Sequence, residues 1–160
     1  MGTGALLRAV FRLEGERTLA LCRLGREPGA EAALEDVEAR LTPALAALEA
    51  LGVAYPAHDV ARRYKFSDAD YLVLQLALLP WQGLAAVQQA TALLGDPGSE
   101  IRVSHVIALV LPGHDDWESA RNALASLRVL DEGIITLSTR SDGDPAVVLS
   151  LSVRELLGLE

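Results

Sequence analysis

The side chains that could perform chemistry are few and widely separated in this sequence. The three histidines are His58, His105 and His114, and no two of them have the i, i+4 spacing of a helical zinc site. The single cysteine, Cys22, excludes an internal disulfide and a multi-thiolate metal site, and we interpret it as a small side chain on a buried face. We interpret His58 as a surface residue, His105 as a helix-start or partly buried residue and His114 as a loop residue. The sequence therefore predicts neither a metal site nor a cofactor.

Motifs of nucleophilic and phosphate-binding enzymes are also missing. There is no Gly-x-Ser-x-Gly, so a serine triad would have no local signature. There is no Gly-x-x-x-x-Gly-Lys-Ser/Thr, and the single lysine, Lys65, lies in no glycine-rich loop. The stretch Ser141-Asp142-Gly143-Asp144 begins like a calcium-binding loop, but the remaining ligands do not follow it. We expect a protein that is not an enzyme.

Composition limits the classes of partner. The chain has 160 residues and 51% apolar residues, which suits one folded domain, or one domain with a helical extension. Its net charge of −8 repels phosphate backbones and argues against nucleic acid as a partner. The longest apolar stretch, Tyr71–Leu79, is too short for a bilayer, which needs about 20 residues. Because Arg8 and Arg12 interrupt the apolar opening, it is not a secretory signal, and we expect a cytoplasmic protein with no membrane partner.

Residues 1–52 are expected to form an N-terminal helical extension. Leucines between residues 5 and 24 predict a helix or an early pair of strands, and Gly15 weakens the single-helix interpretation. Residues 31–51 carry leucines at spacings of three and four, which predict an amphipathic helix. Thr42-Pro43 inside this pattern predicts a kink, or two helices with Thr42 as the second N-cap. We expect the leucine stripe to pack within the chain; a homo-oligomeric scaffold that uses it is the alternative.

Residues 53–160 are expected to form a mainly α domain that ends in a small β-hairpin. Ser67 and Asp70 form a capping-box pattern at the start of an apolar helix that Pro80 should end. Asp115 and Glu118 repeat the capping-box spacing at the start of a later helix. The expected helices are 58–65, 67–79, 81–94, 104–111, 115–127 and 153–157, and the expected strands are 101–103, 129–138 and 146–152. Helix, short strand, two helices and a hairpin are the element order of a winged-helix domain.

Three segments resemble a known family. They are VARRYKFSDADYLVLQLAL at 60–78, LDEGIITLS at 130–138, and a closing segment at 151–158 that ends in Leu-Leu-Gly. They are similar to the N-terminal winged-helix region of a group of bacterial AAA+ ATPases, over roughly residues 30–160. The resemblance implies a module that recruits a substrate or partner for a protein-remodelling ATPase, some of which are associated with phage-tail-like contractile assemblies. Because the P-loop is missing here, neither ATP binding nor hydrolysis carries over.

The expected contact face consists of the helix 115–127 and the wing 139–145. In the helix, Trp117 is a candidate interface anchor, because aromatic side chains carry much of the binding energy at interfaces. Trp117 is also expected, with Ala120, Leu124 and Leu127, to mark the helix's buried face. The candidate partner-binding residues are Asp115, Asp116, Trp117, Glu118, Arg121 and Arg140. We therefore predict a non-catalytic protein-binding adaptor whose partner is an AAA+ ATPase module or its substrate.

A DNA-binding winged-helix regulator is the alternative function. Recognition of bases and phosphates needs arginines or lysines on the recognition helix and the wing. The expected recognition helix instead begins with three acids and offers only Arg121, with Asn122, further along. The best basic patch lies elsewhere, at Arg62, Arg63 and Lys65, and a solvated helix end explains it better. The sequence therefore favours a protein partner over DNA.

Overall fold

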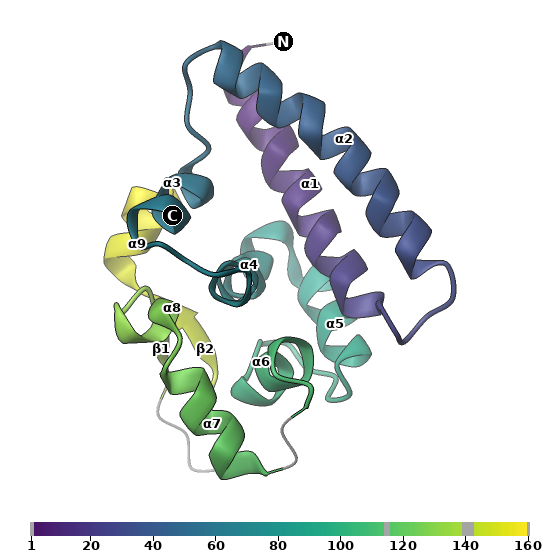
Figure 1. Cartoon of the computed structure of the whole chain (residues 1–160), viewed down its shortest axis with the longest axis vertical. Helices are drawn as coiled ribbons and strands as arrows, with labels where there is room; N and C mark the ends of the chain where they lie inside the picture. Colours follow the sequence, from purple (N-terminus) through teal and green to yellow (C-terminus); the bar gives the residue numbers. More distant parts are fainter. Residues whose placement is uncertain (1, 114–115, 139–142, 160) are drawn as a thin grey trace.

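The computed structural model describes residues 2–113, 116–138 and 143–159. These ranges contain helices and one two-stranded antiparallel sheet (Figure 1), which confirms the expected mainly α fold with a small β-hairpin. The elements are α1 (Thr3–Arg23), α2 (Ala30–Ala50), α3 (Pro56–Arg63), α4 (Asp68–Gln82), α5 (Leu84–Leu93), α6 (Val103–Val110), α7 (Trp117–Ala125), α8 (Arg128–Asp131), β1 (Ile135–Leu137), β2 (Val147–Leu149) and α9 (Leu151–Leu156). The predictions for His114, Asp115, Arg140, Ser141 and Asp142 lie outside the described residues.

The N-terminal segment is one helix, so the alternative of an early strand pair is wrong. Gly15 lies in the middle of α1, where the Gln82 side chain of α4 crosses it so closely that a β-carbon would clash. The Gln82 amide donates a hydrogen bond to the backbone oxygen of Phe11, at 2.6 Å. The glycine therefore serves the contact between two helices and does not break the first one.

The second helix, α2, is continuous through Pro43, and the expectation of two helices with Thr42 as an N-cap is wrong. Thr42 lies inside the helix, where its hydroxyl donates to the backbone oxygen of Glu38 at 3.0 Å. Pro43 and Ala39 both lie on the exposed side, so water can satisfy the Ala39 carbonyl that proline leaves without a donor. The middle of the leucine stripe packs within the chain, as expected: Val37, Leu41 and Leu48 are buried where α2 lies along α1, while Leu51 at its end is 54% exposed (Figure 1).

Helix α4 is the centre of the core. Its start confirms the predicted capping box: Ser67 Oγ accepts from the Asp70 amide at 3.2 Å, and Asp70 Oδ2 accepts from the Ser67 amide at 2.9 Å. The helix contacts α1, α5, α6, α8 and β2, and Figure 1 shows it end-on between them. Pro80, which is exposed, does not end the helix; Gly83, at φ 130°, does so three residues later, and α5 begins at Leu84.

The C-terminal part confirms the predicted hairpin with shorter strands. Strands β1 and β2 pair with Ile135 opposite Leu149, and α9 follows as expected. The strand expected at 129–138 begins only at Ile135, because the Val129 amide is held by the Asp70 carboxylate at 3.1 Å and the chain makes the helical turn α8. The strand expected at 101–103 is a single bridge, between Arg102 and Ala146.

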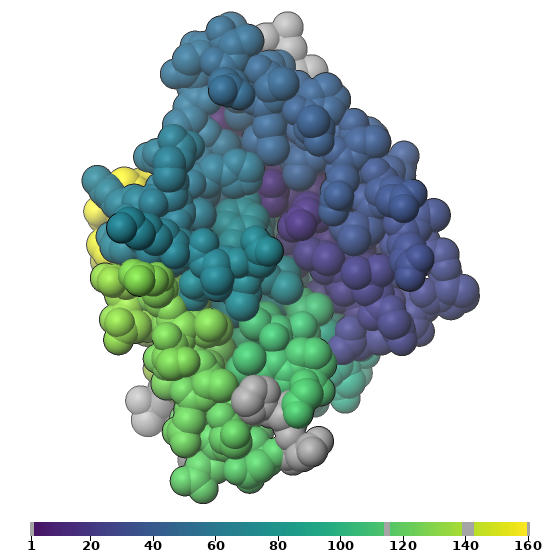
Figure 2. All heavy atoms as spheres, in the orientation of Figure 1, coloured from purple at the N-terminus to yellow at the C-terminus, as the bar shows by residue number. Residues whose placement is uncertain are grey.

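One hydrophobic cluster joins the early and late elements. Buried side chains of α1 and α2, such as Val10 and Leu48, belong to the same cluster as Leu76 of α4 and Leu149 of β2. In the space-filling view α2 covers much of α1, of which only small parts reach the surface on this face (Figure 2). None of the described helices is long and apolar enough to cross a membrane.

Candidate protein-binding face

Helix α7 is capped by one residue of the predicted acidic group. Asp116 Oδ2 accepts a hydrogen bond from the Ser119 amide at 3.0 Å, so the helix begins at Trp117. This corrects the predicted capping box, in which Asp115 and Glu118 were the partners. A carboxylate at this position satisfies one free amide of the first turn and is favoured by the helix dipole.

The outer face of α7 brings four of the six predicted residues together on one exposed surface. Ala120 and Leu124 turn inward and are buried. Asp116, Trp117, Glu118 and Arg121 are exposed, and we call these four residues the α7 face. Residues three and four apart are neighbours on a helix, so Arg121 lies beside both Trp117 and Glu118. The remaining two predicted residues, Asp115 and Arg140, lie outside the described residues.

Trp117 is the prominent member of this face. The prediction that it belongs with Ala120 and Leu124 on the buried side is wrong, because 43% of its surface is exposed. The physical reason is its place in the first helical turn, next to the N-cap, which leaves much of the side chain open to solvent. It is one of only two tryptophans; the other, Trp81, is half-buried under the guanidinium of Arg154, 5.3 Å from the ring centre.

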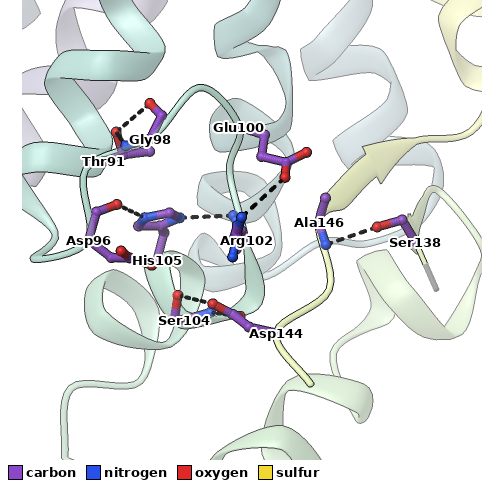
Figure 3. A network of polar contacts seen from close by, with 10 residues as sticks. All are labelled: Thr91, Asp96, Gly98, Glu100, Arg102, Ser104, His105, Ser138, Asp144 and Ala146. Carbon is purple, nitrogen blue, oxygen red and sulfur yellow. Dashed lines mark hydrogen bonds and ion pairs between the residues drawn. The ribbon is translucent and has the colours of Figure 1, made fainter. Parts of the chain in front are cut away.

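The base of the hairpin is attached to the start of α6 by a polar network (Figure 3). The Asp144 carboxylate accepts from the Ser104 amide at 3.0 Å and from the Ser104 hydroxyl at 2.7 Å. Ser138 Oγ accepts from the Ala146 amide at 3.0 Å, on the other side of the hairpin. Asp144 lies in the expected wing 139–145, and its carboxylate binds the start of α6 within the chain. These contacts fix where the hairpin leaves the domain.

His105 ties the loop before α6 to the first turn of that helix. Its ring is buried, with Nδ1 accepting from the Arg102 amide at 2.9 Å and Nε2 lying 2.6 Å from the Asp96 oxygen (Figure 3). Since a carbonyl can only accept, Nε2 carries the proton, and the neutral ring satisfies both partners. Its position in the first turn of α6 confirms the helix-start interpretation, and its role is structural.

A buried polar cluster in the other half of the molecule was missed in the sequence. Glu14 of α1 is only 2% exposed, and its carboxylate accepts from the Tyr71 hydroxyl at 3.0 Å. It also lies 3.2 Å from Nε2 of His58, whose ring packs edge-on against Tyr55 and Tyr71. His58 was interpreted as a surface residue, but its side chain is only one-third exposed. Burial, and then the charge of Glu14, raises the pKa of Tyr71 well above its usual range.

The Glu14 cluster joins α1, α3 and α4 and faces a cavity of about 340 Å³. Its carboxylate can orient the His58 ring, which is one part of an acid–base site. The cavity lining nevertheless includes no serine or cysteine among the described residues, and its one threonine, Thr42, donates back to α2. The sequence contains one indication that Glu14 is buried, which is its spacing of four residues from Val10 and eight from Leu6. In a single helix this spacing puts all three residues on the buried side.

Comparisons with known proteins leave the function to be inferred from the chain itself. No protein-family model, curated protein or solved structure matches this chain. In the described part of the chain, no group of three or more histidine, cysteine, aspartate or glutamate side chains is placed to hold a metal ion.

Proposed function

We propose that this chain is a non-catalytic protein-binding domain that recruits a protein partner through the α7 face. The observation that carries the proposal is the exposed Trp117 between two exposed acids, Asp116 and Glu118. Covering a tryptophan removes a large apolar surface from water, and tryptophans are enriched among the residues that dominate binding energy. The flanking carboxylates favour a partner with a basic rim.

The same face does not favour DNA. Of its three charged side chains two are acidic, and the acids stand at the start of the helix, the end that enters the major groove in helix-turn-helix proteins. Arg121 is the one cation on α7, where Asn122 is a further group able to contact a base. The acidic net charge of −8 adds long-range repulsion. We therefore place a protein, and not a nucleic acid, on α7.

The further proposal is a winged-helix module that serves a bacterial AAA+ ATPase in the cytoplasm. Two observations support it: the family-like segments of the sequence, and the arrangement of the C-terminal elements. Ala146, directly before β2, forms a β-bridge with Arg102 on one edge of that strand, while β1 pairs with β2 on its other edge. With α6 and α7 between Arg102 and β1, this is the element order of a winged helix. The partner would be the ATPase module or the substrate that it remodels.

The test begins with capture of the partner and ends with an affinity. The tagged full chain is expressed in its source cells, and the captured partner is purified and titrated against the wild type, Trp117→Ala and Leu84→Ala. Leu84 is the matched control, because it is exposed to 57% at the start of α5 and lies outside the α7 face. We expect Trp117→Ala to raise the Kd at least about tenfold, the size of an interface hot spot, and Leu84→Ala to leave it within about twofold.

Two results would count against the proposal. Equal Kd values for the wild type and Trp117→Ala, with both proteins folded by circular dichroism, would remove the α7 face from the interface. Capture of a partner that contains no ATPase and is not remodelled by one would leave the binding function but remove the AAA+ assignment.

A further inference from the structure

A second surface of the molecule is an open apolar groove of about 500 Å³, separate from the α7 face. Its walls come from the first half of α1, the start of α3, the end of α4, and α9 with the residues that follow it. The apolar lining includes Leu7, Phe11, Ala57, Leu78, Leu156 and Leu157. In Figure 1, α3 and α9 lie at one side of the molecule and α7 at its lower end. A partner on α7 therefore leaves this groove open.

The rim of the groove carries one cation and one anion. Arg8 stands on the α1 wall and Glu155 on the α9 wall, and both side chains are exposed. Neither forms an ion pair with another described residue. Leu156, next to Glu155 and also part of the lining, is 49% exposed. One surface thus holds an apolar hollow, an exposed leucine and two opposite charges that form no ion pair with other described residues.

We propose that a second copy of this chain occupies the groove, in a twofold-symmetric dimer. In such a contact, residue i of one copy meets residue j of the other and the reverse also holds, so every pair occurs twice. Arg8 of each copy would face Glu155 of the other, and Leu156 of each would enter the opposite groove. A small ligand with one charged group would match only one of the two rim charges, whereas a second copy matches both.

This contact is independent of the leucine stripe first considered for an oligomeric scaffold. That stripe is already used, because Val37, Leu41 and Leu48 of α2 are buried within the chain. The dimer also does not depend on the function proposed for α7, since the two surfaces are separate. Failure of one proposal would leave the other unaffected.

Sedimentation velocity of the full chain over a wide concentration range tests the dimer. The wild type should shift with concentration from the 17.0 kDa monomer to twice that mass. Arg8→Glu and Glu155→Arg should each raise the dimer dissociation constant at least about tenfold, because each places two like-charged pairs at the contact. The double variant Arg8→Glu/Glu155→Arg should return to near the wild-type value, because it restores both pairs in reverse.

A matched pair of leucines tests the apolar part. Leu156→Ser should weaken the dimer at least about tenfold, whereas Leu151→Ser should not, because Leu151 is on the same helix, 70% exposed and outside the groove lining. A wild type that stays monomeric at every concentration would overturn the proposal. So would a dimer that the double charge variant fails to restore, or one that Leu156→Ser leaves intact.

Discussion

Asp70 should be the most costly single polar side chain to remove. Its carboxylate is 2% exposed and accepts three hydrogen bonds, from the amide and hydroxyl of Ser67, both at 2.9 Å, and from the Val129 amide at 3.1 Å. It therefore starts α4 and also ties α4 to α8, the turn that follows α7. Asp70→Ala removes the reciprocal half of the capping box, so that the Ser67 amide loses its acceptor, and it leaves the Val129 amide buried without a partner.

The magnitude follows from these two losses. Losing the Asp70 half of the capping box costs about 1 kcal/mol, and a buried amide without its acceptor costs about 2 to 3 kcal/mol, so Asp70→Ala should lower the free energy of unfolding by about 3 to 4 kcal/mol. Ser67→Ala removes only the cap and should cost about 1 kcal/mol. Urea unfolding followed by circular dichroism measures both. Equal losses for the two variants would refute the reasoning, because the contact with Val129 would then contribute nothing.

Three further substitutions test separate parts of the fold. Burial raises the pKa of the Cys22 thiol from 9.0 to about 11, so the folded chain holds this proton more tightly than the unfolded chain does. The free energy of unfolding should therefore fall by about 2 kcal/mol as the pH rises from 9 towards 11. In urea unfolding measured across this pH range, Cys22→Ala should reduce that fall. Glu14→Gln should lower the free energy of unfolding in urea by about 1 to 3 kcal/mol, because a glutamine can accept hydrogen bonds at only one of its two terminal atoms. The same change at the exposed Glu38 should lower it by less than about 0.5 kcal/mol. Gly15→Ala should change the melting temperature little, because the higher helix propensity of alanine offsets the displacement of the Gln82 terminal amide from its hydrogen bond to Phe11. Gly4→Ala, which meets only ordinary contact, should leave the melting temperature equal or raise it, and a rise at Gly15 well above that at Gly4 would contradict the helix contact.

The features that the sequence predicted correctly depend on neighbours along the chain. The capping pair Ser67 and Asp70 is separated by three residues, and the pattern alone defines its hydrogen bonds. The hairpin and the leucine stripe of α2 follow likewise from local periodicity. The family-level interpretation, by contrast, stays a prediction, because the chain's fold class does not by itself define a function.

The features that it missed depend on contacts between distant segments. Glu14 meets His58 and Tyr71 only after α1, α3 and α4 have packed, and no spacing in the sequence links these positions. Two prolines were expected to interrupt their helices, but Pro43 and Pro80 both lie on exposed sides of continuous helices. Water can reach the Ala39 carbonyl that Pro43 leaves without a donor, whereas Leu76, four residues before Pro80, is buried. The helical spacing of Trp117 with Ala120 and Leu124 predicted burial of all three side chains. Trp117 is nevertheless 43% exposed, because it lies in the first turn of α7.

The proposed function requires that a protein partner covers Trp117. The most direct measurement is the fluorine spectrum of the chain labelled with 5-fluorotryptophan, which gives two resonances, assigned with the Trp81→Phe variant. Because the added partner carries no label, each resonance reports only on this chain, and the half-buried Trp81 serves as the internal control. On titration with the captured partner, we expect the Trp117 resonance to shift with saturation while that of Trp81 stays in place. A bound complex in which the Trp117 resonance does not move would contradict the claim.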